Sequence, residues 1–126
     1  MNRKLSFMLA LVVVAYALGC ASTSPGIHMS RLADVKAGKS AIQVDTFGEG
    51  EVPAVVVTGC GGHNVVIRIV NLADKKLVKT YREYVPESWV RWWWFNDLSN
   101  GSYRADLSIE GEDIASVQFV INRQTQ

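Results

Sequence analysis

FNDLSNGSY, residues 95–103, is the stretch that says most about the fold of this chain. Asp97 to Gly101 is rich in turn-forming residues and predicts a tight corner. From residue 102 to 109 the chain then alternates apolar and polar side chains, which is the period of a half-buried β-strand. The apolar face of this strand is Tyr103, Ala105, Leu107 and Ile109, and the polar face includes Arg104, Asp106 and Ser108.

The same two-residue period recurs over most of the chain after residue 40. Turn-forming residues interrupt it at short intervals, and no long helical pattern is present there. We therefore predict an all-β domain, a single sandwich of about seven antiparallel strands. The predicted strands are 41–47, 52–58, 64–71, 77–85, 89–95, 102–109 and 115–121. Ahead of them, residues 30–36 predict one or two helical turns, capped by Ser30 and ended by Gly38.

The corner carries a resemblance to a known class of domain. Leu98, Gly101 and Tyr103 match the L-x-x-G-x-Y corner, which resembles that of fibronectin type III and bacterial immunoglobulin-like domains. In those domains the leucine fills the end of the core, the glycine turns, and the tyrosine bonds back to the corner. The resemblance implies an Ig-like or fibronectin type III-like sandwich. The Cys–Trp–Cys pattern of antibody domains is absent, which argues against a true antibody-like domain.

The N-terminal segment has the pattern of an export signal. Arg3 and Lys4 precede fourteen mainly apolar residues, 5–18, which end at Gly19 and Cys20. A helix of that length spans about 21 Å, which is short of the roughly 30 Å hydrocarbon core of a bilayer. The segment therefore fits the apolar region of a signal peptide better than a permanent transmembrane helix.

Ala17-Leu18-Gly19-Cys20 resembles the lipobox of bacterial lipoproteins. In that family a peptidase cuts before the cysteine, and acyl chains such as palmitate are attached at the new terminus; the resemblance implies this for Cys20. The predicted division is a signal peptide at 1–19, a lipid anchor and flexible tether at 20–39, and the β-sandwich at 40–123. An ordinary secretory signal is the alternative, and it would leave Cys20 as a plain thiol able to pair with Cys60.

The lipobox resemblance also implies a place in the cell. We expect a bacterial cell-envelope protein that is held to the membrane by lipid on Cys20. In a host with two membranes, the family favours the periplasmic side of the outer membrane. Removal of residues 1–19 leaves eleven basic residues against twelve acidic ones, so the mature chain has no basic excess to attract nucleic acid.

The least ordinary stretch is WVRWWWF, residues 89–95. In a strand, Trp93 shares a face with Phe95, and Trp92, Trp94 and Val90 share the opposite face. If Trp93 faces the core, two tryptophans lie side by side on the outside and form an apolar patch that needs an explanation. Three explanations remain open. The tether, residues 30–36 or a neighbouring strand covers the patch; or the patch contacts a protein; or it contacts sugar or lipid.

Other candidate sites are weaker. Cys60 and His63 have the spacing of two metal ligands, but a zinc site needs three or four, and only His28 is left among the softer ligands. As a thiolate–base pair they lack an orienting third group. The carboxylates Glu49, Glu51, Glu110, Glu112 and Asp113 lie in predicted turns and follow no calcium-loop pattern. We expect no cofactor and no metal.

These observations favour a non-enzymatic role. We expect an accessory or interaction lipoprotein that presents a surface of its β-sandwich to an envelope protein partner. The main alternative is a glycan-binding module that uses exposed Trp92 and Trp94 as stacking platforms for envelope polysaccharide. A third hypothesis, from the enzyme class, is a small hydrolase or thiol enzyme at Cys60 and His63.

Overall fold

Strands dominate the computed structural model, which describes residues 24–86 and 90–124. Within these ranges the chain forms eight strands and one short helix. They are β1 (Gly26–Arg31), α2 (Leu32–Lys36), β2 (Thr46–Phe47), β3 (Pro53–Thr58), β4 (His63–Asn71), β5 (Leu77–Val85), β6 (Arg91–Trp94), β7 (Gly101–Ile109) and β8 (Glu112–Ile121). The signal peptide, Cys20 and Trp89 lie outside the described residues.

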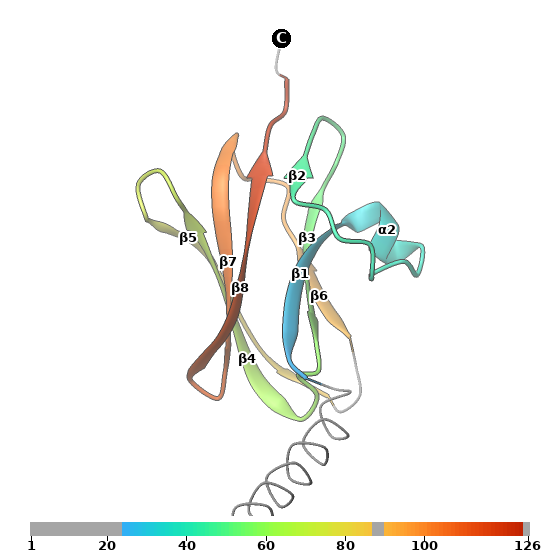
Figure 1. Ribbon diagram of the computed structural model, residues 1–126, viewed down its shortest axis with the longest axis vertical. Coiled ribbons are helices and arrows are strands. Elements are labelled where there is room, and N and C mark those ends of the chain that lie inside the picture. The colour runs from blue at the N-terminus through green and yellow to red at the C-terminus, as the bar shows by residue number, and fades with distance from the viewer. Residues whose placement is uncertain (1–23, 87–89, 125–126) are drawn as a thin grey trace, which may run out of the picture.

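The strands form two sheets that pack face to face, as Figure 1 shows. The smaller sheet has the order β1-β3-β6, and the larger has the order β2-β8-β7-β4-β5. Lettered along the chain as A, B, C, C′, E, F and G, with β2 left aside, the sheets read A-B-E and G-F-C-C′. That order belongs to the immunoglobulin-like sandwiches. The predicted all-β sandwich is therefore confirmed, with one difference: β2 pairs parallel with β8.

The core lies between the sheets and follows from the alternation in the sequence. On β4 the inward residues Val65, Ile67 and Ile69 lie opposite Ile109, Leu107 and Ala105 of β7, and all six are buried. From the smaller sheet, Val55 and Val57 of β3 meet them. Because these β-branched and aliphatic side chains repeat every second residue, one face of each strand is buried against the other sheet.

The corner before β7 has the hydrogen bond that the tyrosine motif implies. The Tyr103 hydroxyl donates to the carbonyl oxygen of Ser99 at 2.7 Å, and Leu98 packs against the core. The corner is also joined to the end of the chain, since the side chain of Asn100 exchanges two hydrogen bonds with the backbone of Arg123, at 2.7 and 2.8 Å. These contacts fix the entry of β7 into the larger sheet.

The sandwich begins at Gly26, which corrects the predicted tether of 20–39 and the predicted domain of 40–123. β1 pairs along the whole of β3, from Gly26 opposite Thr58 to Arg31 opposite Pro53, and Met29 is buried in the core. The sequence signal was weak because only Ile27 and Met29 alternate with polar residues over so short a strand. Any tether is therefore shorter than the sequence suggested.

The segment after β1 also differs from the prediction in two ways. Helix α2 forms where it was expected, but Ser30 is not its cap: the Ser30 hydroxyl donates to the carbonyl of Ile42, and Arg31 holds the cap position without a side-chain capping bond to the helix. The predicted strand 41–47 shrinks to β2. Residues 40–45 instead run as a strap along β1, where the Val44 amide donates to the Met29 carbonyl at 2.9 Å.

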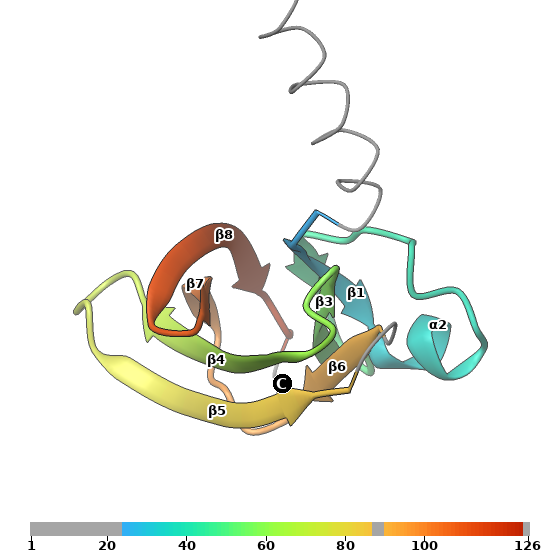
Figure 2. The ribbon, with the colours of Figure 1, turned by 90° about the horizontal axis from the view of Figure 1, so that it is seen from below.

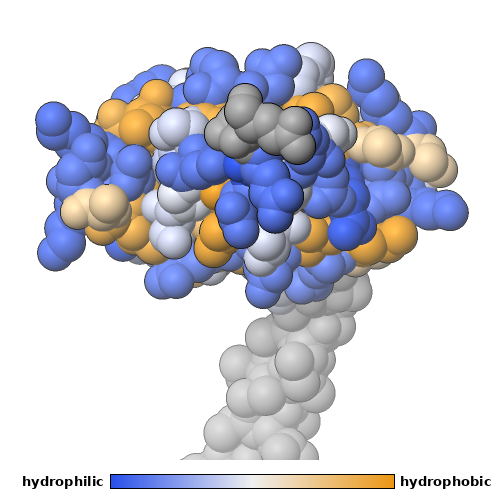
Figure 3. Space-filling view, turned by 90° about the horizontal axis from the view of Figure 1, so that it is seen from above, coloured by the Kyte–Doolittle hydropathy of each residue, from blue (hydrophilic) through white to orange (hydrophobic). Residues whose placement is uncertain are grey.

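The two ends of the sandwich carry different loops. β1 begins at the end that also holds the β3–β4 and β7–β8 loops, while the chain leaves β8 at the opposite end (Figure 1). Viewed along the strands, α2 lies outside the smaller sheet (Figure 2). The end from which the chain leaves is largely hydrophilic in the face seen in Figure 3. Among the described residues, none belongs to a helix with the length and apolarity needed to cross a bilayer.

Candidate interaction surface

The three consecutive tryptophans of β6 have three different environments. β6 pairs with β3 so that Trp93 lies opposite Val55, Trp92 opposite Val56 and Trp94 opposite Ala54. Trp93 points between the sheets and is only 8% exposed, whereas Trp94 is 51% exposed. Trp92 is partly buried. The alternation of faces predicted from the sequence is therefore observed, but the two outer tryptophans are not equivalent.

Helix α2 explains the difference between Trp92 and Trp94. Val35 of α2 is buried against Ala54 and Val56 on the outer face of β3, and Trp92 packs against this small cluster. The helix is held over the sheet by the Leu32 amide, which donates to the Val52 carbonyl at 2.9 Å. Of the covers considered from the sequence, residues 30–36 supply the one over Trp92.

Val90 and Trp94 remain open on either side of the covered Trp92. Val90 is 41% exposed and lies just before β6, and Trp94 is the last residue of this strand. β6 is an edge strand, since it pairs with β3 and with no other described strand. We call Val90 and Trp94, with the exposed part of Trp92 between them, the Trp94 surface. An apolar set of this kind on an edge strand is typical of a contact region.

The charges next to this surface are engaged within the chain. Arg91 donates to Glu83 of β5 through two nitrogens, the second at 3.1 Å, and its guanidinium lies 4.9 Å from the centre of the Trp93 ring. Lys79 donates to Asp97 at 2.7 Å. Hydrogen bonds from Arg91 and Lys79 lower the pKa of Glu83 and of Asp97, and the bond to Asp97 raises the pKa of Lys79. Glu83, Asp97 and Lys79 are therefore stabilised in their charged forms.

An aromatic stack lies between these two ion pairs. Tyr81 of β5 stacks on Trp93 and Phe95, with ring centres 6.0 and 6.5 Å apart. Successive inward residues of β5, namely Lys79, Tyr81 and Glu83, thus each contact β6 or the segment after it. These contacts between β5 and β6 fix β6, and with it the Trp94 surface, against the larger sheet. Offset aromatic pairs of this kind add about 0.5–1.5 kcal/mol each beyond the area they bury.

The structure does not bring Cys60 and His63 together as a catalytic pair. Cys60 is fully buried, and its Sγ lies 3.4 Å from the Thr58 carbonyl oxygen. Burial raises the pKa of the Cys60 thiol, which disfavours the reactive thiolate. His63 is exposed, and its Nδ1 lies 3.8 Å from a carboxylate oxygen of Glu110. The buried thiol fits a packing role.

Cys60 should accordingly resist thiol reagents while the protein is folded. We expect an aromatic disulfide reagent, which releases a coloured thiolate when it reacts, to modify Cys60 only after denaturant is added. The reagent reaches the sulfur only when β3 and the following loop open. The measurement is the rate of thiol modification with and without urea, with a Cys60→Ser variant as control. Rapid modification of the folded protein would contradict this and would revive the thiol-enzyme hypothesis.

Three of the five turn carboxylates have structural partners. Glu51 accepts hydrogen bonds from the Gly48 amide and from Arg31, and these bonds lower the pKa of Glu51. Glu110 accepts from the amide of Asn64 at 2.8 Å, and Asp113 accepts from the Ser108 hydroxyl at 2.8 Å. Within 24–86 and 90–124, His, Cys, Asp and Glu form no group of three or more that could hold a metal ion.

Two features of this region are not predicted by the sequence analysis. The first is the cover over Trp92, which depends on where α2 folds back. The second is that β5 and β6 are edge strands on the same side of the sandwich, which depends on strand order. A weak signal for the second was present in β5 itself, whose exposed Leu77, Val78 and Tyr84 are apolar or aromatic. In comparisons with known proteins, no family model and no curated protein sequence matches this chain.

Proposed function

We propose that this chain is a lipid-anchored lipoprotein of the bacterial cell envelope that has no enzymatic activity and presents the Trp94 surface to an envelope protein. The observation that carries the proposal is the half-exposed Trp94 on an edge strand. Tryptophan is enriched where proteins meet, because its large ring loses little conformational freedom on binding. The anchor rests on the lipobox resemblance at Cys20.

The electrostatics of the region support a protein partner. The charged side chains that join β5 to β6 and to the segment after it are already paired, Arg91 with Glu83 and Lys79 with Asp97, so these charges have partners before anything binds. A partner can therefore cover Trp94 and Val90 without leaving one of these charges buried and unpaired, which would cost several kcal/mol. The exposed apolar groups are then available for burial at about 25 cal/mol per Å².

Trp94→Ala is the sharpest test of this function. Photo-crosslinking in intact cells should join the wild-type protein to one envelope protein, and Trp94→Ala should lose that product. Ile114→Ala is a matched control, because Ile114 is also an exposed apolar residue but lies on β8, in the other sheet. If both variants keep the cross-linked product, the Trp94 surface is not the contact region.

Glycan binding is the second candidate, and the exposed ring of Trp94 is what favours it. Because Trp92 packs under α2, a sugar would stack on Trp94 rather than on a pair of rings. Retention of the wild-type protein on envelope polysaccharide, and its loss in Trp94→Ala, would support this function. Loss of a cross-linked protein without any retention on polysaccharide would support the protein partner instead.

A further inference from the structure

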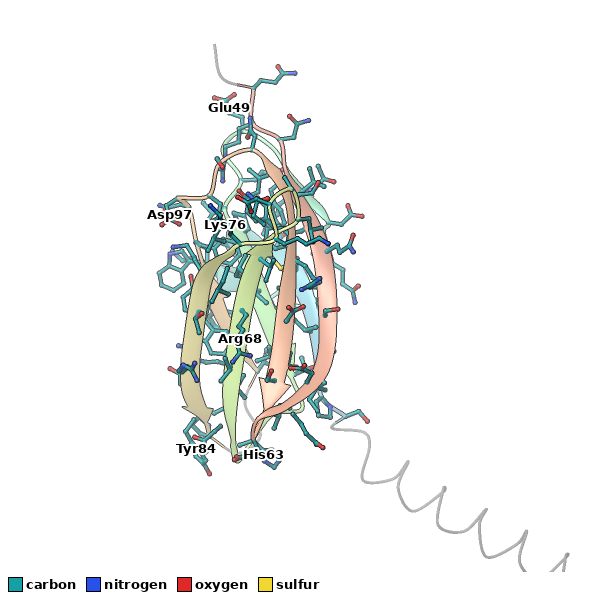
Figure 4. The ribbon with its side chains drawn as sticks, turned by 90° about the vertical axis from the view of Figure 1, so that its left-hand side faces the viewer. Glu49, His63, Arg68, Lys76, Tyr84 and Asp97 are labelled. Carbon is teal, nitrogen blue, oxygen red and sulfur yellow. The ribbon has the colours of Figure 1, made fainter. Side chains whose placement is uncertain are left out.

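The two sides of the sandwich, where the edges of the two sheets meet, differ: one is bridged by the chain and the other ends in a free strand edge. On one side, the strap and β2 join the sheets: the Val44 amide bonds to Met29 of β1, and the Val120 amide of β8 bonds to the Asp45 carbonyl at 2.8 Å. On the other side, β5 pairs with β4 and with no other described strand. Figure 4 shows β5 at this margin of the larger sheet, with Tyr84 near its end. An uncovered strand of nine residues is a template for pairing with another chain.

The backbone groups that point to this free edge can be assigned from hydrogen bonds between β4 and β7. The Glu110 amide donates to Asn64, and the Leu72 amide donates to Ser102, so even-numbered residues of β4 direct their backbone groups to β7. The odd-numbered residues then bond to odd-numbered residues of β5, such as Ile67 with Tyr81. The unpaired N–H and C=O groups of β5 therefore belong to Thr80, Arg82 and Tyr84.

We propose that β5 pairs antiparallel with β5 of a second copy of this chain, about a two-fold axis at Tyr81. Tyr81 is the central residue of the strand, and the sequence on either side of it is self-complementary. In this register Thr80 lies opposite Arg82 of the second copy, and Lys79 lies opposite Glu83. A β-bulge at Val78 interrupts the ladder between β4 and β5, so the regular pairing ends at Lys79. The proposal concerns a different surface from Trp94, and only its orientation at the membrane rests on the proposed lipid anchor.

Lys79 and Glu83 of the second copy occupy the kind of antiparallel pair in which opposite side chains lie closest together. Thr80 and Arg82 of the second copy form the hydrogen-bonded pair, because their backbone groups face outward. Lys79 and Glu83 of the second copy then form the non-hydrogen-bonded pair, in which the Cα atoms are only about 4.5 Å apart and the side chains are closest. Because Lys79 already bonds Asp97 and Glu83 already bonds Arg91, pairing links these into one network of alternating charge.

Neighbouring registers are less favourable. A two-fold axis at Arg82 places two Arg82 side chains opposite each other, and like charges opposite each other are destabilising. An axis at Thr80 places Leu77 opposite Glu83 and leaves Lys79 without an opposite charge. An axis between two residues would pair an outward backbone group with an inward one, which the antiparallel ladder does not allow. Charge and hydrogen bonding together select the axis at Tyr81.

The exposed side chains of β5 fit the same pairing. Leu77 and Tyr84 are 54% and 58% exposed, and Val78 is exposed as well. Three of the large apolar residues that the described part of the chain exposes thus lie on one strand. In the paired arrangement Leu77 and Val78 of one copy lie at the same end of the contact as Tyr84 of the other, so these exposed apolar and aromatic groups gather at both ends of the paired strands.

The symmetry is compatible with two lipid anchors in one membrane. Identical chains in one leaflet are related by an axis along the membrane normal, and the proposed axis is perpendicular to the sheet. The dimer would lie with its sheets parallel to the bilayer. The six peptide bonds from Cys20 to Gly26 let this segment reach at most about 20 Å, which is enough because the two sheets are about 10 Å apart.

Cysteine cross-linking tests the register directly. Thr80→Cys and Arg82→Cys are made as separate single variants of the full chain, at exposed positions. Their Cα atoms would be about 5.5 Å apart across the axis, within the range of a disulfide. We expect a disulfide-linked dimer when the two variants are co-expressed in membranes and oxidised, and little product from either variant alone.

The controls decide between outcomes. Wild type reports any background from Cys20 and buried Cys60, and Ser116→Cys, exposed on β8, reports random collision. Product from the mixed variants above both controls supports the proposal. Product no greater than that of Ser116→Cys overturns it, as does stronger product from Thr80→Cys alone or Arg82→Cys alone. Cross-linking of these cysteines to a different protein overturns it as well.

A second measurement does not rely on engineered thiols. Thr80→Pro removes an outward N–H, so it should abolish the dimer seen by sedimentation of the detergent-extracted protein while β5 keeps its bonds to β4. Thr80→Val keeps the N–H and should leave the dimer unchanged. Circular dichroism shows whether each variant is folded. A wild-type protein that stays monomeric at every concentration reached, in detergent and in membranes, would overturn the proposal.

Discussion

Replacement of Trp93 by alanine should lower the free energy of unfolding by about 3–5 kcal/mol, the range for a large aromatic side chain removed from a core. Trp93 is buried between the sheets, where it stacks on Tyr81 and carries the Arg91 guanidinium over its ring. Its loss leaves a cavity and removes contacts from both residues. The ion pair between Arg91 and Glu83 then lies beside this cavity and no longer packs against an indole ring.

The neighbouring tryptophan supplies the matched control. Trp94→Ala should lower the free energy of unfolding by about 1–2 kcal/mol, less than Trp93→Ala, because half of that side chain is already in water. Trp92→Ala should fall between the two, since the residue packs against Val35, Ala54 and Val56. Urea unfolding followed by far-ultraviolet circular dichroism measures all three without depending on tryptophan fluorescence. Equal losses for Trp93→Ala and Trp94→Ala would mean that the faces of β6 are wrongly assigned.

Strands with a strong local pattern were predictable from the sequence. Residues 102–109 and 64–71 alternate over a full strand, and both appear within a residue of the expected bounds, as β7 and β4. The continuous apolar run at 52–58 predicted a central strand. β3 is central, and it is buried on both faces because Val55 and Val57 face the core while Ala54 and Val56 lie beneath α2.

Elements that depend on distant partners were missed. β1 has only two alternating apolar residues, Ile27 and Met29, and it becomes a strand because the edge of β3 is available for pairing. Ile42 and Val44 looked like one face of a strand, but this segment is used to bridge β1 and β8. Local periodicity carries no information on which edges the rest of the chain leaves open.

The candidate surface was predictable in part for the same reason. Alternation alone separates Trp93 from Trp92 and Trp94, since it depends on neighbours in one strand. Whether an outer tryptophan is exposed depends on α2, whose Val35 crosses over to the outer face of β3. The free edge of β5 is likewise a property of strand order, and only the structure supplies the order.

Replacement of Cys20 by serine should move the protein out of the membrane fraction. Serine has no thiol for the acyl transfer that the lipobox implies, and an anchor gains about 0.8 kcal/mol for each buried CH₂. Two or more chains hold a domain firmly, so their loss should be close to all-or-none in fractionation. Incorporation of a clickable fatty acid, which should label the wild type and not Cys20→Ser, measures the modification itself.

Cys60→Ser is the control that isolates the anchor, because it removes the other thiol without touching the lipobox. Cys60 is buried and has the Thr58 carbonyl beside its sulfur, so this variant should keep both the fatty-acid label and the membrane location. With Gly26 already in β1, only five residues separate Cys20 from the folded domain, and the domain should stay within about 20 Å of the bilayer surface. A Cys20→Ser protein that still sediments with membranes, together with an unlabelled wild type, would favour the ordinary secretory signal and leave some other contact to hold the domain there.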